Sequence, residues 1–168
     1  METIVNRVAA SPLVSLDLET YYPKGERLVY DLKDNLFQEM ILKEKDFREF
    51  VKNHDWSSYE GKYVAIHCSV EAIVPTWAYM LIASKLESFA KDIVFGDETD
   101  LEDYLMRKAI ENINGADFKD AKVVVKGCGD LPIGESAYVD LTKKLTPFVS
   151  SLMFGEPCST VPIYKRPK

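Results

Sequence analysis

Tyr63-Val64-Ala65-Ile66-His67 is a short run of apolar and β-branched residues, and it decides the fold. Such a continuous run is typical of a strand buried on both faces of a sheet. Pro75 then opens a helix, expected to extend to about Ala90, because proline fits the first helical turn. The unit recurs, with strands expected at 93–96, 123–126 and 152–154 and helices at 99–115 and 138–145. This order predicts an α/β fold whose mainly parallel sheet is built of strand-helix units over about residues 62–157.

The first sixty residues have a different pattern. Residues 13–18 alternate apolar and polar side chains as a half-buried strand does, and residues 27–32 give a second strand. Apolar side chains at helical spacing from Phe47 to His54 mark a short amphipathic helix. We expect residues 1–60 to form an N-terminal α+β layer on the sheet, within a single domain over 1–168. In the other part, residues 61–168, the strand-helix units are followed by a basic tail from Pro162 that we expect to be solvated.

The composition is that of an ordinary globular protein. Of 168 residues, 46% are hydrophobic and 29% are charged, which argues against disorder. A net charge of −6 argues against nucleic acid as a partner. Residues 1–7 lack the features of a secretory signal, and the most apolar stretch, 73–89, is interrupted by charges, so we expect a cytoplasmic protein without a membrane span.

The three cysteines follow the ends of predicted strands. Cys68, Cys128 and Cys158 are separated by 60 and 30 residues (128 − 68 and 158 − 128), close to two units and one unit of strand and helix. The carboxyl ends of parallel strands meet at one edge of a sheet, where ligands of open α/β sheets bind. The spacing therefore predicts that the three thiols converge.

Three converging thiols suggest a metal centre. Thiolates suit zinc or an iron-sulfur cluster, and three of them leave one coordination position for another ligand. His67 is the candidate fourth ligand, although it alternates with Cys68 along the strand and so points to the other face. The sequence has no Cys-x-x-Cys pair, which is the stronger metal signal.

Two other interpretations remain open. Free cysteine is among the most buried residue types, so the protein is alternatively a non-catalytic interaction domain with structural cysteines, binding a partner or forming a homo-oligomer. A thiol enzyme would use Cys128 or Cys158 with His67 as its base. The sequence identifies no catalytic constellation that would decide whether the protein is an enzyme.

Five blocks of sequence carry a family likeness: NRV at 6–8, LDLE at 16–19, LKEKDFR at 42–48, IVPTWAYM at 73–80 and GEPCSTVP at 155–162. With them the chain resembles the uncharacterised bacterial family called domain of unknown function 2480. The resemblance names no activity. Because members are often encoded near genes for iron-sulfur cluster assembly, it implies iron-sulfur assembly proteins as partners and draws attention to Cys68, Cys128 and Cys158.

Overall fold

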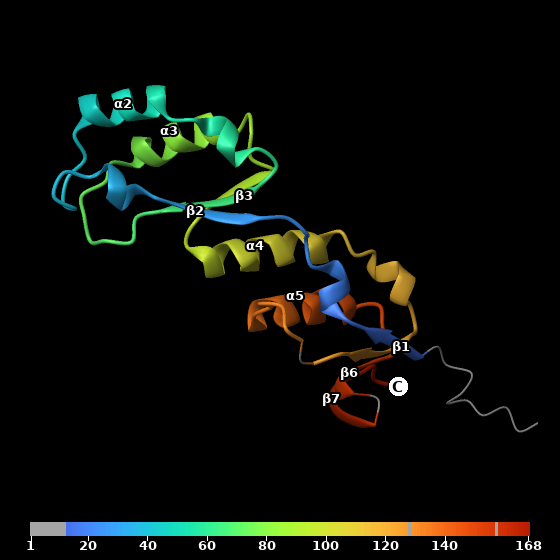
Figure 1. The fold of residues 1–168 in the computed structure, drawn as a ribbon. Helices are drawn as coiled ribbons and strands as arrows, with labels where there is room; N and C mark the ends of the chain where they lie inside the picture. The colour runs from blue at the N-terminus through green and yellow to red at the C-terminus, as the bar shows by residue number, and fades with distance from the viewer. Residues whose placement is uncertain (1–12, 128, 157) are drawn as a thin grey trace, which may run out of the picture. The chain divides into compact units, whose positions relative to one another are not determined.

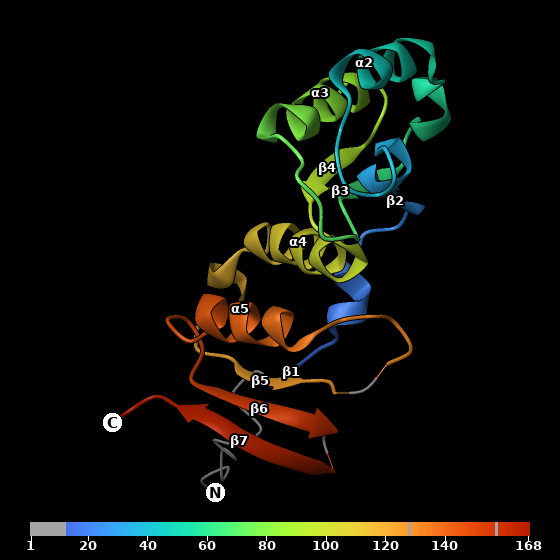
Figure 2. The same ribbon diagram turned by 90° about the vertical axis from the view of Figure 1, so that its left-hand side faces the viewer.

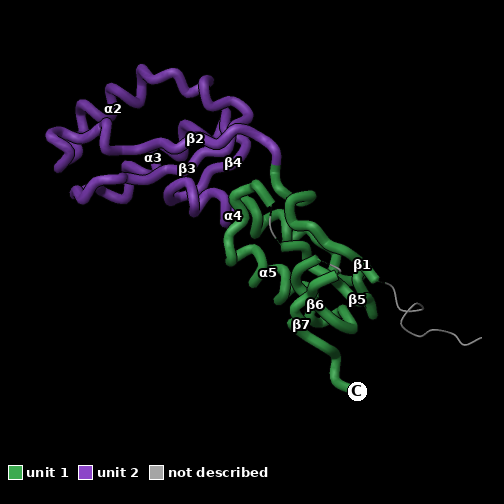
Figure 3. The backbone as a smooth tube through the Cα atoms, turned by 60° about the horizontal axis from the view of Figure 1, so that its bottom comes forward, with its two compact units in different colours: residues 1–23, 105–168 green, residues 24–104 purple. Residues whose placement is uncertain are grey.

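The computed structural model describes residues 13–127, 129–156 and 158–168 (Figure 1). The chain divides into two compact units, which Figure 3 colours separately. Unit 2 is the continuous segment Lys24–Tyr104, and unit 1 combines the residues before it with those after it. No helix among the described residues is long and apolar enough to cross a membrane.

Unit 2 is built on a parallel sheet in the order β2-β3-β4. Its strands are β2 (Arg27–Asp31), β3 (Tyr63–His67) and β4 (Asp92–Phe95). Helices α2 (Glu44–Asn53) and α3 (Thr76–Leu86) cover one face, as Figures 1 and 2 show. The core between helices and sheet is apolar because α2 contributes Phe47 and Val51, and α3 contributes Ile82 and Leu86.

Unit 1 is built on a second sheet in the order β1-β5-β6-β7. Its strands are β1 (Leu13–Leu16), β5 (Lys122–Val125), β6 (Ser151–Glu156) and β7 (Ser159–Lys165). The first three are parallel, and β7 turns back antiparallel to β6. Helix α5 (Glu135–Leu145) and the C-terminal part of α4 (Glu98–Glu111) pack on this sheet, and Figure 2 shows α5 above the strands.

The two units repeat the same architecture at a constant spacing. Tyr63 pairs with Asp92 in unit 2 and Lys122 pairs with Ser151 in unit 1, a shift of 59 residues for both partners (122 − 63 and 151 − 92). Helices α3 and α5 obey the same shift. Several residue types recur with it: Ala78 and Ala137, Tyr79 and Tyr138, Leu86 and Leu145, Phe89 and Phe148, Phe95 and Phe154, Gly96 and Gly155.

Hydrogen bonds outside the sheets repeat as well. A 3₁₀ turn precedes the central strand of each unit, capped by Asp55 in unit 2 and by Asn114 in unit 1. Gly61 then donates its N–H to Phe89 O at 3.0 Å, and its counterpart Asp120 donates to Phe148 O at 2.8 Å. The chain therefore contains two copies of one βαβ arrangement, which differ after β4 and β6.

The predicted α/β class is confirmed, and two details of it are corrected. The strands belong to two sheets rather than one, and the described part of the N-terminal layer, residues 13–60, is not separate because β1 and β2 are the first strands of the two sheets. Pro162, Ile163 and Lys165 are exposed, as expected of a solvated tail, but residues Pro162–Lys165 also belong to β7, a strand that the sequence did not predict. A single domain over 1–168 stays a prediction.

Candidate functional site

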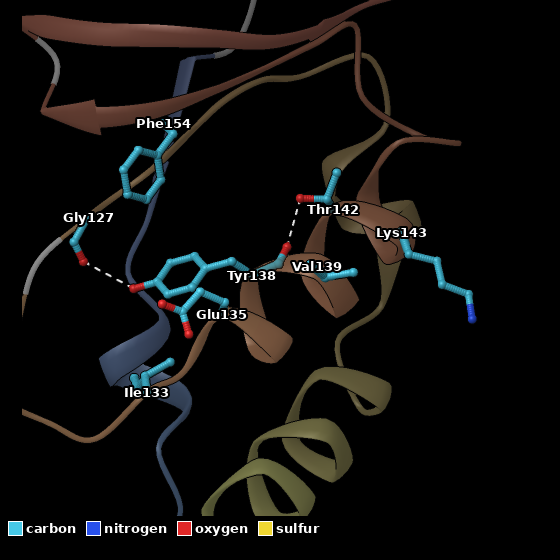
Figure 4. Close-up of a pocket in the computed structure, with 8 residues that line it drawn as sticks. All are labelled: Gly127, Ile133, Glu135, Tyr138, Val139, Thr142, Lys143 and Phe154. Atoms are coloured by element: carbon cyan, nitrogen blue, oxygen red, sulfur yellow. Dashed lines mark hydrogen bonds between the residues drawn. The ribbon is translucent and has the colours of Figure 1, made fainter.

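An apolar groove lies in unit 1, beside the carboxyl end of the sheet. Its volume is about 760 Å³, which is in the range of small-ligand and side-chain pockets. We call it the α5 groove. It is lined by residues from the loop after β5, from α5 and from β6, drawn in Figure 4: Gly127, Ile133, Glu135, Tyr138, Val139, Thr142, Lys143 and Phe154.

Tyr138 fixes the shape of the α5 groove. Its hydroxyl donates to Gly127 O at 3.1 Å, which ties α5 to the loop after β5 (Figure 4). Its ring meets Phe154 edge to face, with 5.8 Å between ring centroids and an interplanar angle of 85°. A Cβ on Gly127 would lie 3.2 Å from the Phe154 ring, so glycine allows the loop to approach β6 closely.

Several large apolar side chains are exposed to solvent on the surface around the groove. Val139 on α5 is 66% exposed, and Phe154 on β6 is also exposed. Val161 and Ile163 extend this apolar surface onto β7. Contiguous exposed apolar side chains are typical of binding surfaces.

The loop after β5 is held from the end of β1. Glu19 Oε1 accepts a hydrogen bond from Leu131 N at 3.3 Å, and Lys126 Nζ lies 3.9 Å from Asp17 Oδ2. A Cβ on Gly129 would overlap the Glu19 carboxylate. Because Gly129 has no side chain, it leaves room for the Glu19 carboxylate.

The cysteines do not share one sheet edge. Cys68 follows β3 in unit 2, where it is half-buried and its Sγ donates to Val70 O at 3.4 Å. Cys158 is exposed in the turn between β6 and β7 of unit 1. Cys128 lies outside the described residues. The expectation of one edge is wrong for Cys68 because the strands it was based on divide between two sheets. The alternative interpretation, in which the cysteines are buried structural residues, is likewise wrong for Cys158, because Cys158 is exposed.

The metal-ligand assignments stay predictions. Within 13–127, 129–156 and 158–168, no three His, Cys, Asp or Glu side chains are grouped so as to hold a metal ion. The candidate fourth ligand His67 ends β3 opposite Asp31 of β2. The pKa of Asp31 is lowered: burial opposes this shift, but hydrogen bonds from Ser69 and Lys33 outweigh it, and His67 adds to them.

Sequence reasoning did not find the α5 groove. The sequence predicts only that Tyr138 begins a helix and that Phe154 ends a strand, and it gives no signal for Val139. The 59-residue repeat was the available signal, because it marks Tyr138 and Phe154 as the counterparts of Tyr79 and Phe95, which also meet edge to face.

The two sheets and the groove define an α/β protein with an internal repeat and an exposed apolar surface beside the groove. The chain belongs to the family described as protein of unknown function (DUF2480), which matches residues 2–166. This confirms the resemblance seen in the sequence. Comparisons with curated proteins and with solved structures found no match.

Proposed function

We propose that this protein is a non-catalytic interaction protein whose α5 groove binds an apolar segment of a protein partner. The observation that carries the proposal is the exposure of Val139 and Phe154 next to an open groove. Burying such side chains against a partner stabilises a complex in proportion to the apolar area removed from water. An amphipathic segment is the natural occupant, because grooves of this kind bind regularly spaced apolar anchors.

The rim of the groove adds charge to this apolar surface. Glu135 lies in the first turn of α5, and Lys143 lies near the other end of the helix. A bound segment with a basic residue near Glu135 and an acidic residue near Lys143 would match both charges. Rim charges of this kind favour one orientation and raise the rate of association more than they raise affinity.

The test uses the fluorescent apolar probe 1-anilinonaphthalene-8-sulfonate and the full chain. We expect saturable binding that Val139→Glu weakens by about tenfold. Leu13→Glu is the matched control, since Leu13 is 64% exposed on β1 and does not line the groove. Unchanged binding by Val139→Glu, or equal weakening by both variants, would contradict the proposal.

A second candidate function concerns the thiols of unit 1. Cys128 follows β5 and Cys158 follows β6, and these strands are parallel neighbours. This arrangement supports a zinc or iron-sulfur site that uses these two cysteines and excludes Cys68, in a reducing cytoplasm. The family resemblance supports a role for such a site in iron-sulfur cluster assembly.

Metal analysis after anaerobic purification tests this second candidate. Cys128→Ser and Cys158→Ser are expected to lose the metal, whereas the control Cys68→Ser keeps it. A metal-free wild-type protein, or a Cys158→Ser variant with full metal content, would overturn the two-cysteine site.

A further inference from the structure

The sheet of unit 1 has helices on one face only. Val123, Val125 and Leu152 point into the core beneath α5 (Figure 2). Successive residues of a strand point to opposite faces, so Val124 and Met153 point to the other face. No helix in the described part of unit 1 covers that face, although parallel strands such as β1, β5 and β6 are usually covered on both faces. We call it the open face of unit 1.

The open face carries a cationic row and an apolar row. Lys122 of β5 lies beside Ser151 of β6, and Ser151 lies opposite Lys165 of β7. In the next row along the strands, Val124 lies beside Met153. Both rows line a groove of about 680 Å³, and no acidic residue lines it in the described part of the chain. Neither lysine has an acidic partner among the described residues.

The equivalent face of unit 2 is covered by a helix. Its first row is formed by Arg27, Tyr63 and Asp92 on three neighbouring strands. This row points away from α2 and α3, because the residues that follow it on β3 and β4 pack against those helices. Glu102 Oε1 of α4 lies 2.8 Å from Arg27 Nε. The hydroxyl of Tyr104, also on α4, donates to Asp92 Oδ1 at 3.3 Å. The first half of α4 therefore lies over this face and places a carboxylate on the cation of the row.

We propose that the open face of unit 1 binds an acidic amphipathic helix of a partner protein. By the 59-residue shift, Lys122 and Ser151 are the counterparts of Tyr63 and Asp92, so unit 1 repeats the row that α4 covers in unit 2. The partner helix takes the place that α4 has in unit 2. Its carboxylates pair with Lys122 and Lys165, and its apolar stripe covers the apolar row.

The spacing of the two lysines fits one helix. Lys122 and Lys165 are two strands apart, which is about 10 Å. A helix with its side chains has a diameter of about 10–12 Å. A helix that lies along β6 therefore has one ammonium group on each side, and a carboxylate on each edge of its apolar stripe pairs with them. Because both charges on the face are positive, a basic helix is excluded and an acidic one is selected.

A synthetic peptide with the sequence of α4, Glu98–Glu111, is the probe, held helical by a side-chain bridge on its polar side. At about 100° per residue, Leu101 and Leu105 form one apolar stripe, and Asp100 and Glu102 lie on opposite sides of it. The peptide therefore carries the features that the open face requires. NMR titration of the isotope-labelled full chain measures its binding.

We expect the peptide to shift the amide signals of the cationic and apolar rows in a saturable way. The double variant Lys122→Glu and Lys165→Glu should raise the peptide Kd by at least about tenfold. The matched control is the double variant Lys52→Glu and Lys85→Glu, which changes the net charge equally at exposed positions of unit 2. The control should leave the Kd unchanged.

Exchanging the charges separates lost binding from misfolding. A peptide with Asp100→Lys and Glu102→Lys should not bind the wild-type protein, but it should bind the double variant Lys122→Glu and Lys165→Glu. The proposal would be overturned by an α4 peptide that does not bind, by equal binding to the double variant, or by no binding in the exchanged pair.

Two further measurements identify the surface and its occupant. Val139→Glu, which tests the α5 groove, should not change the Kd of the α4 peptide, so failure of the helix site and failure of the proposed function are separate results. If Val139→Glu abolished peptide binding, the peptide would be in the α5 groove and the open face would be the wrong assignment. Tighter binding after deletion of residues 2–12 would assign the open face to the N-terminal segment of the same chain and overturn the partner helix.

Discussion

The hydroxyl of Tyr138 donates to the main-chain carbonyl of Gly127 at 3.1 Å, so that helix α5 and the loop after β5 are joined across the α5 groove. The same ring packs edge to face on Phe154 of β6. One side chain thereby connects three segments that are separate in sequence, and the shape of the groove depends on it.

Tyr138→Phe removes the hydrogen bond and keeps the ring contact. We expect the free energy of unfolding to fall by about 1 kcal/mol, the usual contribution of one hydrogen bond. Tyr138→Ala also removes the ring and should cost about 3 kcal/mol. Urea unfolding measures both variants, and equal losses would show that the ring contact contributes nothing.

Glu102→Gln should strongly destabilise unit 2. Arg27 Nε lies 2.8 Å from Glu102 Oε1, and the side chains are only 13% and 7% exposed. Removing the carboxylate charge from a guanidinium shielded from water costs about 3 kcal/mol. Chemical denaturation measures the loss.

The matched control is Glu44→Gln, which removes an exposed ion pair with Arg48. The distance from Arg48 Nε to Glu44 Oε1 is 3.0 Å, similar to that of the buried pair. An exposed helix pair contributes only about 0.3–0.5 kcal/mol. If the two variants lost equal stability, burial of the Arg27–Glu102 pair would have no energetic effect.

The contribution of the Arg166–Asp120 pair to stability should be sensitive to acid. The hydrogen bond from Arg166, helped by the charges of Arg166 and Lys119, lowers the pKa of Asp120. A lowered pKa means that the pair stabilises the fold above the unfolded value of about 3.9 and that this stabilisation is lost as the pH falls through the folded value. Carboxyl NMR titration should find that Arg166→Gln raises the pKa of Asp120.

The difference in stability between wild type and Arg166→Gln should then become smaller at acid pH. Arg166 also donates to Phe148 O at 2.8 Å, and this bond does not titrate. A difference in stability that stays constant as the pH falls through the pKa of Asp120 would assign the whole effect to that main-chain bond.

Gly61 is expected to tolerate aspartate better than alanine. Its φ is 69°, and its counterpart Asp120 has a φ of 61°. A Cβ at Gly61 would meet nothing within 4 Å, so the cost of Gly61→Ala is conformational, about 1 kcal/mol. Aspartate adopts this backbone conformation more readily. Thermal unfolding should therefore show a smaller loss for Gly61→Asp, and a larger one would contradict the equivalence of the two positions.

Local signals in the sequence were sufficient for most elements. Pro75 places the start of α3, because proline favours the first helical turn. The expected ends of the two helices, at about 90 and 115, lie four residues beyond the observed ends at Leu86 and Glu111. Strand β7 was missed because Pro162 and the basic residues around it argue against a strand. In the structure Pro162 lies opposite Met153 in the ladder to β6.

The division into two sheets depends on contacts that are distant in sequence. Residues 13–18 and 27–32 have equivalent strand patterns, and nothing local assigns β1 to β5 and β2 to β3. The expectation that Cys68 shares one sheet edge with the other cysteines failed for the same reason. It assumed that strands adjacent in sequence are adjacent in one sheet.

The insertion of unit 2 within unit 1 sets an order for folding during synthesis. The segment Lys24–Tyr104 contains every strand of its own sheet and leaves the ribosome as a complete unit. Leu13 of β1, which is made earlier, pairs with Lys122 and has no partner strand until after that unit has emerged. Domains generally fold as units while the chain is being made. Of the strands that the structure describes, the one made first is therefore among the last to be paired.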